Sequence, residues 1–368
     1  MKPIVQLALF TLLALQAASA LHAYPIDGYA DTGIRRVEGA RLANEGLAKG
    51  GKQPPGALLT TAQVDLRLLD HKDMDLPAPD PAFTAELLKL LGDNAGSYGV
   101  AVLDLSNPEK PRYAEHRGDY RQNVGSVGKL IVALGLFQAL ADTWPDDTGQ
   151  RVRVLRDTRV TADEFSQSDH HKLRIFDVEN RKLIRRTMRI GDQGSLWEYL
   201  DWTLSVSSNA AAAMTMRESM LLRQYGKDYP PAEQEIERFF KETPGKELTA
   251  LFQRTFFEPI TRNGLDLEKL RQGSFFTRQG KQRVNGGGNS YGTARELMRF
   301  MLRMEQGRLV DEFSSRQIKR LLYMTERRIR YASAPALRDA AVYFKSGSLY
   351  SCREEEGFTC KPYAGNRK

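Results

Sequence analysis

The sequence predicts an α+β fold, in which buried helices combine with short antiparallel strands. Residues 131–141 are apolar on nearly every side, a pattern typical of a helix buried inside a domain. Segments 98–105 and 112–116 are typical of a strand pair around an Asn-Pro turn. Prolines divide the segment 217–284 into helical pieces. Together these patterns favour a helical protein with a smaller share of antiparallel strand.

Other helix starts are predicted from local signals. A helix is expected to begin near Pro81 and to run up to Gly92, because apolar residues recur between them at helical spacing. Ser195 and Thr293 each stand three residues before a glutamate, the capping-box pattern that opens a helix. The helix at Ser195 is expected to lead into a serine-rich segment near residue 207.

Two stretches carry less regular patterns. Residues 151–190 alternate basic and apolar side chains, which predicts short exposed strands in an elaboration of the domain. Within it, Asp169, His170 and His171 suggest a metal site at first sight, but no further His or Cys gives ligand spacing, so we interpret them as a solvated turn. Residues 285–289 are rich in glycine without a Gly-Lys-Ser/Thr, which predicts a flexible connector rather than a phosphate loop.

Composition divides the chain into three parts. Lys2, the apolar run 3–15 and small residues before two candidate cleavage points predict a secretory signal peptide over residues 1–23, too short for a stable membrane anchor. Residues 24–80 are polar and punctuated by Gly and Pro; this N-terminal extension of unknown role either packs on the domain or is partly ordered. Residues 81–368 hold the remaining predicted elements.

Charge and cysteine content indicate the kind of binding partner and the cellular compartment. Fifty-four Lys and Arg against 46 Asp and Glu give a net charge of +8, which suits anionic substrates or acidic envelope polymers. No basic and aromatic module accompanies that charge, which argues against nucleic-acid binding. Cys352 and Cys360 are expected to form a disulfide in an oxidising compartment. Together with the predicted signal peptide, this indicates a periplasmic or secreted protein; we expect it to be a monomer.

A serine and a lysine stand at the start of the apolar helix. Ser126 and Lys129 are three residues apart, so their side chains lie on one face of a helix and can meet. That pair offers a nucleophile with its base. The five histidines and the absence of a Gly-x-Ser-x-Gly pattern give poor support for a Ser-His-Asp triad, so a lysine has to act as the base.

Two further patterns each occur once. Ser207-Ser208-Asn209 is the only Ser-x-Asn in the chain and opens an alanine-rich helix. Lys345-Ser346-Gly347 is the only Lys-Ser/Thr-Gly and ends an apolar run expected to be a strand. With Ser126 and Lys129 they follow the order found in the penicillin-recognising serine hydrolases.

From about residue 81 onward the chain resembles the class A β-lactamases and their D-alanyl-D-alanine peptidase relatives. The segments 204–211 and 292–298 extend the resemblance beyond the three motifs. The resemblance implies a five-stranded antiparallel sheet packed by helices, beside an all-helical lobe, with the active site between them. Only 21 residues follow Gly347, so the family's last strands and closing helix are expected to be missing and the domain C-terminally incomplete.

The resemblance also implies roles for individual residues. Ser126 would be the acylated nucleophile, Lys129 its base, and Ser207 the relay of a proton to the leaving nitrogen. Asn209 would hold the substrate amide, and Lys345 and Ser346 its carboxylate. Gly347 completes the third motif, and the backbone N–H groups of Ser126 and Ser348 would stabilise the oxyanion.

One part of the family pattern is absent. Class A β-lactamases carry a Glu-x-x-Leu-Asn whose glutamate activates the deacylating water, and this chain has no such pattern. Glu258 and Glu268 are the nearest candidates for the deacylating base. The expected function is β-lactam hydrolysis; a D-alanyl-D-alanine peptidase or related amidase or esterase is the alternative, and a non-catalytic binder or sensor of cell-wall fragments is the third. Each takes a small-molecule or peptide substrate and needs no metal or organic cofactor.

Overall fold

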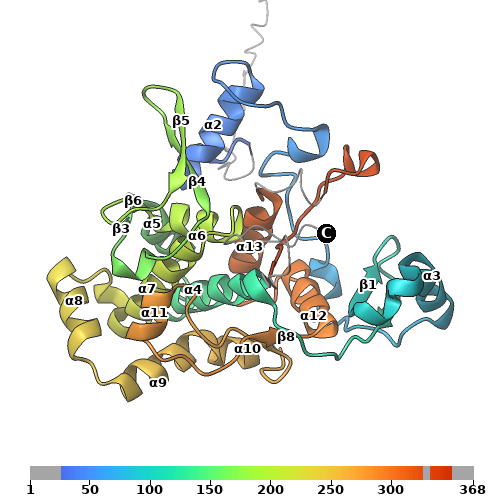
Figure 1. The fold of residues 1–368 in the computed structure, drawn as a ribbon. Helices are drawn as coiled ribbons and strands as arrows, with labels where there is room; N and C mark the ends of the chain where they lie inside the picture. Colours follow the sequence, from blue (N-terminus) through green and yellow to red (C-terminus); the bar gives the residue numbers. More distant parts are fainter. Residues whose placement is uncertain (1–25, 326–331, 350–368) are drawn as a thin grey trace, which may run out of the picture.

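The computed structural model describes residues 26–325 and 332–349 (Figure 1). The predicted signal peptide and both cysteines lie outside these residues. The helices are α1 Tyr29–Thr32, α2 Arg35–Asn44, α3 Pro81–Leu91, α4 Lys129–Thr143, α5 Thr148–Asp157, α6 Leu196–Leu204, α7 Asn209–Tyr225, α8 Glu233–Glu242, α9 Gly245–Phe256, α10 Glu258–Arg262, α11 Arg278–Arg283, α12 Ala294–Glu305 and α13 Glu312–Tyr323. The strands are β1 Val100–Asp104, β2 Arg112–His116, β3 Arg159–Thr161, β4 Lys172–Asp177, β5 Lys182–Thr187, β6 Gln193–Ser195, β7 Leu270–Arg271 and β8 Tyr291–Gly292.

The α+β class is confirmed, with helices as the larger share. Within the described ranges the strands form four antiparallel pairs: β1 with β2, β3 with β6, β4 with β5, and β7 with β8. The single five-stranded sheet is not formed there, and the segment before the third motif has no strand partner among the described residues. Its backbone instead approaches α13, where the Phe344 N–H donates to the Leu322 carbonyl at 3.4 Å.

Helix α4 is the centre of the core, as its sequence predicts. Its residues from Lys129 to Leu140 are all buried, and α6, α7 and α9 pack around it (Figure 1). Gly135 permits the close approach of α9, since a Cβ there would lie 2.7 Å from the Thr255 carbonyl oxygen. The segment Gly125–Thr143 is apolar and long enough to cross a membrane, but 72% of its most apolar window is buried inside the protein. It therefore has the character of a core helix.

The N-terminal extension packs on the body, which is the first of the two predicted alternatives. Ile34 and Val37 belong to the hydrophobic core. Arg36 on α2 forms a buried ion pair with Asp201 on α6, with Nε and Oδ2 2.5 Å apart. Further along, the Leu68 N–H donates to the carbonyl of Glu305 on α12 at 3.1 Å. The described part of the extension is thus held by both α6 and α12.

The β1–β2 pair, with α3 beside it, lies at one side of the molecule (Figure 1). Helix α3 begins at the predicted proline, where the Asp80 carboxylate caps the N–H groups of Ala82 and Phe83. The register pairs Val100 with His116 and Asp104 with Arg112. These predicted boundaries are confirmed to within a few residues.

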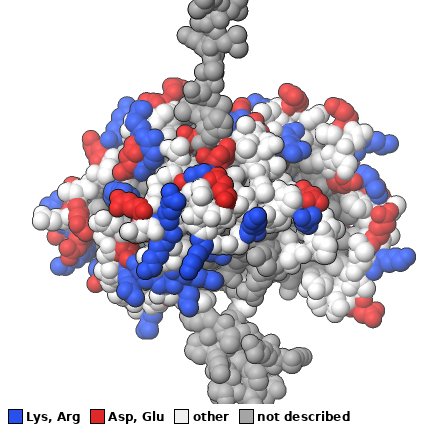
Figure 2. Space-filling view, turned by 90° about the horizontal axis from the view of Figure 1, so that it is seen from above, with Lys and Arg blue, Asp and Glu red and all other residues white. Residues whose placement is uncertain are grey.

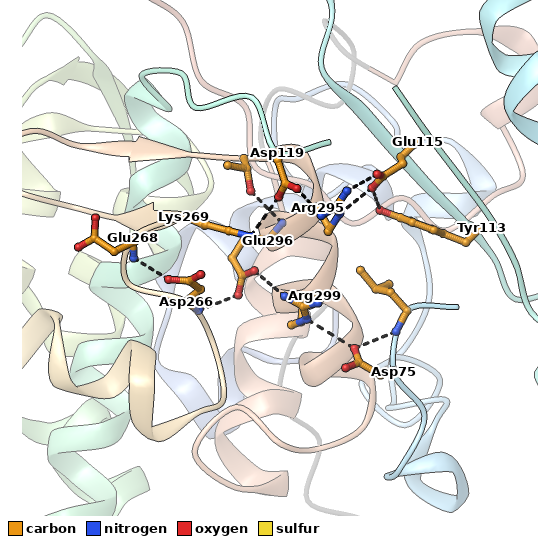
Figure 3. Close-up of polar contacts among 12 residues, drawn as sticks. Asp75, Tyr113, Glu115, Asp119, Asp266, Glu268, Lys269, Arg295, Glu296 and Arg299 are labelled. Atoms are coloured by element: carbon orange, nitrogen blue, oxygen red, sulfur yellow. Dashed lines mark hydrogen bonds and ion pairs between the residues drawn. The ribbon is translucent and has the colours of Figure 1, made fainter. Parts of the chain in front are cut away.

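A network of charged side chains fixes the segment between β2 and Ser126 (Figure 3). Arg295 on α12 binds both Glu115 on β2 and Asp119 after it. Lys269 also pairs with Asp119, at 3.3 Å. Because Asp119 precedes Ser126 by seven residues, these contacts hold the chain that leads into the candidate site.

The 151–190 segment differs from its prediction in its first part. Residues 148–157 form helix α5 rather than a strand, because Asp147 caps the Gln150 N–H at 2.7 Å and Arg151 is buried. The strand prediction holds for β4 and β5, which form a hairpin.

Figure 2 shows basic and acidic side chains interspersed over the face seen from above, with several basic ones gathered together on it.

Candidate active site

Ser126 and Lys129 meet at the start of α4. Ser126 lies in a 3₁₀ turn, Gly125–Gly128, and Lys129 is the first residue of the α-helix. The Lys129 ammonium donates to Ser126 Oγ at 2.9 Å. Ser126 is only partly buried, whereas Lys129 is fully buried. The serine hydroxyl is thus open to a substrate while its lysine partner is shielded.

Lys129 is also bonded to the second motif. Its Nζ donates to Asn209 Oδ1 at 2.7 Å and to the Ser207 carbonyl at 2.9 Å, and lies 3.5 Å from Ser207 Oγ. The same nitrogen lies 4.4 Å from the centre of the Phe276 ring. The buried amine is thus surrounded by oxygen acceptors from the first and second motifs.

The third motif also contacts Ser207. Lys345 Nζ donates to Ser207 Oγ at 2.8 Å and to the Ser346 carbonyl at 2.7 Å. Gly347 lies so close to the turn that carries Ser126 that a Cβ there would be 2.6 Å from the Val124 carbonyl oxygen. Ser126, Lys129, Ser207 and Lys345 therefore form one connected chain of polar contacts.

A cleft of about 340 Å³ opens beside Ser126. Polar side chains and glycines form most of its wall, together with two phenylalanines: Asn123, Gly125, Ser126, Asn209, Gln272, Ser274, Phe275, Phe276, Lys281, Gly288, Asn289, Ser290 and Ser348. Ser126 and Ser348, whose backbone N–H groups are the predicted oxyanion donors, both lie on this wall. The 285–289 segment, predicted to be only a connector, supplies Gly288 and Asn289 to it.

A family comparison accounts for this constellation. The model of a family described as "Beta-lactamase enzyme family" matches residues 82–364 of the chain. The protein belongs to this family. Among curated proteins, none matches this chain.

Several solved structures of β-lactamases and penicillin-binding proteins show distant likeness. A β-lactamase from Chitinophaga pinensis is 12% identical, with 74% of this chain and 80% of that one covered and a TM-score of 0.45. A β-lactamase from Sphaerobacter thermophilus is 13% identical, with 68% and 74% covered and a TM-score of 0.42. A mutant of PBP-A, in an acyl-enzyme complex with penicillin G, is 15% identical, with 69% and 73% covered and a TM-score of 0.40.

In this β-lactamase-family protein, neither candidate glutamate reaches the cleft wall. Glu258 begins α10, is 45% exposed and pairs with Arg262 in the next turn. Glu268 is 65% exposed and lies 3.4 Å from Arg121; in Figure 3 its side chain points away from the charged network. Their role as the deacylating base stays a prediction, and both side chains contact arginines outside the cleft wall.

Gln272 lies in the cleft wall but was not predicted as a site residue. It is 3% exposed, and its Nε2 donates to the Ser274 carbonyl at 2.6 Å. Its Oε1 has no hydrogen-bond partner among the residues that the structure describes, and a Cβ on Gly128 would lie 2.0 Å from that oxygen. Gln272 therefore packs directly over the turn that carries Ser126. No sequence pattern marks it, because glutamine carries no recognisable catalytic signature.

For Asp169, the prediction of a solvated turn is wrong. Its side chain is 3% exposed, so it is not a solvated turn residue. It accepts a hydrogen bond from Ser208 Oγ at 2.7 Å, within the second motif. His170 and His171 stay beside it, and the possible ligand atoms of the three lie within 4.8 Å of one another.

Proposed function

We propose that this protein is a serine hydrolase that opens β-lactam rings through an acyl-enzyme on Ser126. The observation that carries the proposal is the 2.9 Å contact between Lys129 Nζ and Ser126 Oγ, at the edge of a cleft. A neutral Lys129 can take the serine proton as Ser126 attacks the lactam carbonyl. The bond formed is a serine ester, and the bond broken is the ring amide.

The leaving nitrogen needs a proton when the ring opens. Ser207 is suited to deliver it, because its Oγ lies 3.5 Å from Lys129 Nζ and 2.8 Å from Lys345 Nζ. The backbone N–H groups of Ser126 and Ser348 are the proposed donors to the oxyanion. Lys345 and Ser346 would receive the substrate carboxylate, and Asn209 its side-chain amide.

The alternative function is that of a D-alanyl-D-alanine peptidase or a related amidase or esterase. One observation favours it: among the described residues that line the cleft, none carries a carboxylate. Without a positioned base, the acyl-enzyme would hydrolyse slowly, as suits an enzyme that passes its acyl group to other acceptors. The +8 charge and the predicted signal peptide support a periplasmic or secreted location for either activity.

Two reagents separate these functions. A fluorescent penicillin measures acylation, and a chromogenic cephalosporin measures turnover. Fast turnover of the cephalosporin supports the β-lactamase, stable labelling by the penicillin supports the peptidase, and neither signal supports a non-catalytic binder. Mass spectrometry should place the adduct on the peptide that contains Ser126. Ser126→Ala and Lys129→Met should both abolish labelling; an adduct on another serine would refute the assignment.

A further inference from the structure

Asp169 joins the 151–190 segment to the second motif. One carboxylate oxygen accepts from the His171 backbone N–H at 3.2 Å and lies 2.6 Å from His171 Nδ1. The other accepts from Ser208 Oγ at 2.7 Å and from the Ala210 N–H at 3.0 Å. Burial opposes ionisation, but the hydrogen bonds from His171, Ala210 and Ser208 hold the pKa of Asp169 well below its ordinary value of 3.8. A buried carboxylate with donors on both oxygens is a fixed structural link.

The segment that Asp169 holds is strained. Ser207 has a φ of 65°, a left-handed conformation that a residue other than glycine adopts at a cost. Such a conformation persists only where neighbouring contacts enforce it. Ser208 supplies three of them: its N–H donates to the Trp202 carbonyl, and its Oγ bonds both the Ala211 N–H and Asp169.

The residues on either side of Ser208 are those that contact the lysine. Ser207 and Asn209 both bond Lys129 Nζ, and Asn209 is the first residue of α7. A carboxylate at the N-terminus of α7 also interacts favourably with the helix dipole. Any movement of this helix start would change the distances around Lys129.

We infer that Asp169 is a positioning residue for the acylation of Ser126, because it fixes Ser207 and Asn209 against Lys129. The inference rests on the proposed acylation and extends it to a residue of the 151–190 segment. A metal site formed by Asp169, His170 and His171 is the competing reading of the same cluster. The geometry favours the positioning role, because protein donors already bond both Asp169 oxygens.

The first experiment measures the limiting acylation rate with a fluorescent penicillin. Asp169→Ala is expected to lower it by about 10- to 100-fold, the size of effect that a misplacement of about 1 Å produces. Asp169→Asn, which keeps one acceptor oxygen, should lose less. Asp177→Ala is the matched control, because Asp177 lies in the same segment and bonds Asn180 in the hairpin turn. It should acylate like the parent, and circular dichroism should show all variants folded at the assay temperature.

A double-mutant cycle tests whether Asp169 acts through its contact with Ser208 rather than through a general loss of structure. Ser208→Ala removes the hydroxyl from the other end of the 2.7 Å contact. If Asp169 acts through Ser208, Asp169→Asn and Ser208→Ala together should slow acylation by clearly less than the product of the single effects. Multiplicative effects, or a folded Asp169→Ala that acylates at the parent's rate, would overturn the inference.

Hydrogen exchange tests the same link without any substrate. In Asp169→Ala, or in Asp169→Asn if the first variant does not fold, amide exchange should accelerate in peptides covering the start of α7. Exchange at the end of α7 should stay as in the parent. In the control Asp177→Ala, exchange at the start of α7 should also stay as in the parent.

If the penicillin does not label the parent at Ser126, the proposed function fails, while the exchange result still decides whether Asp169 holds the helix start. Unchanged exchange at residues 208–211 in the Asp169 variant would overturn the inference that Asp169 holds this helix start. Zinc titrated into the parent should leave the exchange unaltered; protection at residues 169–171 would support the metal site instead.

Discussion

Lys345 donates a hydrogen bond to Ser207, with 2.8 Å between Nζ and Oγ. The third motif therefore contacts the second motif directly, even without a substrate. Lys345 is half-buried, and its ammonium also donates to the Ser346 carbonyl at 2.7 Å. The contact gives Lys345 two possible effects on acylation, one on the substrate carboxylate and one on the proton relay through Ser207.

Lys345→Ala should slow acylation by a carboxylate-bearing penicillin by about 1.5 to 3 kcal/mol, the usual worth of a hydrogen bond to a charged group. An ester without that carboxylate should lose much less. Ser207→Ala is the companion variant and should slow both substrates alike, because the leaving group needs a proton in each case. Equal losses on the two substrates in Lys345→Ala would mean that Lys345 acts only through Ser207.

The ion pair between Arg36 and Asp201 makes the N-terminal extension part of the fold. Arg36 is 6% and Asp201 0% exposed. Arg36→Ala leaves a buried carboxylate uncompensated and should lower the free energy of unfolding by about 3 to 5 kcal/mol. Arg41→Ala on the same helix removes surface pairs with Glu38 and Glu45 and should cost only about 0 to 1 kcal/mol. Urea denaturation measures both; a loss as small for Arg36 as for Arg41 would show that the extension contributes little.

The network in Figure 3 predicts a pH dependence. The hydrogen bond from Arg295 holds the pKa of Glu115 below its ordinary value of 4.5, although burial opposes this, and the Tyr113 hydroxyl contributes to the lowering. A lowered carboxyl pKa adds stability that is complete above the unfolded pKa and is lost as the pH falls through the folded pKa. Glu115→Gln should therefore be less stable than the parent at pH 7, and the difference should shrink as the pH falls below 4.5.

Thermal melts at several pH values measure this difference. Glu109→Gln is the control, because Glu109 is 83% exposed and lies 3.7 Å from His71, beyond hydrogen-bond distance. The melting temperature of Glu109→Gln should equal that of the parent at every pH. A constant difference for Glu115→Gln between pH 7 and pH 3 would contradict the assigned role of Arg295.

Local patterns predicted much of this structure, and contacts distant in sequence account for the rest. The capping box at Ser195 forms as predicted, with Glu198 bonding back, because its two partners are three residues apart. The Ser126–Lys129 contact follows from helix geometry in the same way. The strand prediction is wrong at Arg151. An alternating pattern assumes that arginine is exposed, whereas Arg151 is buried and donates to the carbonyls of Trp144 and Pro145.

The candidate site shows the same division. The three motifs were found because each pattern is local and unique in the chain. Asp169 could not be assigned, because its partner Ser208 is 39 residues away and nothing in the intervening sequence indicates the contact. Gln272 likewise became visible only when the fold placed its side chain over Gly128.

Deacylation should limit turnover if the acyl-enzyme forms. A positioned base that activates water is typically worth about 10² to 10⁴ in rate, and the described cleft wall carries no carboxylate. An initial burst equal to the enzyme concentration should therefore precede a slow steady state. Glu258→Gln and Glu268→Gln should keep that burst, since both glutamates are well exposed and lie outside the cleft wall.

Gln272→Glu provides the converse test of slow deacylation. Gln272 Oε1 is buried over the Ser126 turn without a hydrogen-bond partner among the described residues, and an amide oxygen cannot take up a proton at neutral pH. A carboxylate at the same position could, so Gln272→Glu should raise the steady-state rate and diminish the burst while the acylation rate stays near that of the parent. Gln272→Leu, which matches the size but lacks the oxygen, is the control and should keep the burst.

Stopped-flow traces with a chromogenic cephalosporin distinguish these cases. A parent without a burst, in which Glu258→Gln or Glu268→Gln creates one and spares acylation, would identify that glutamate as the deacylating base and contradict the slow-deacylation prediction.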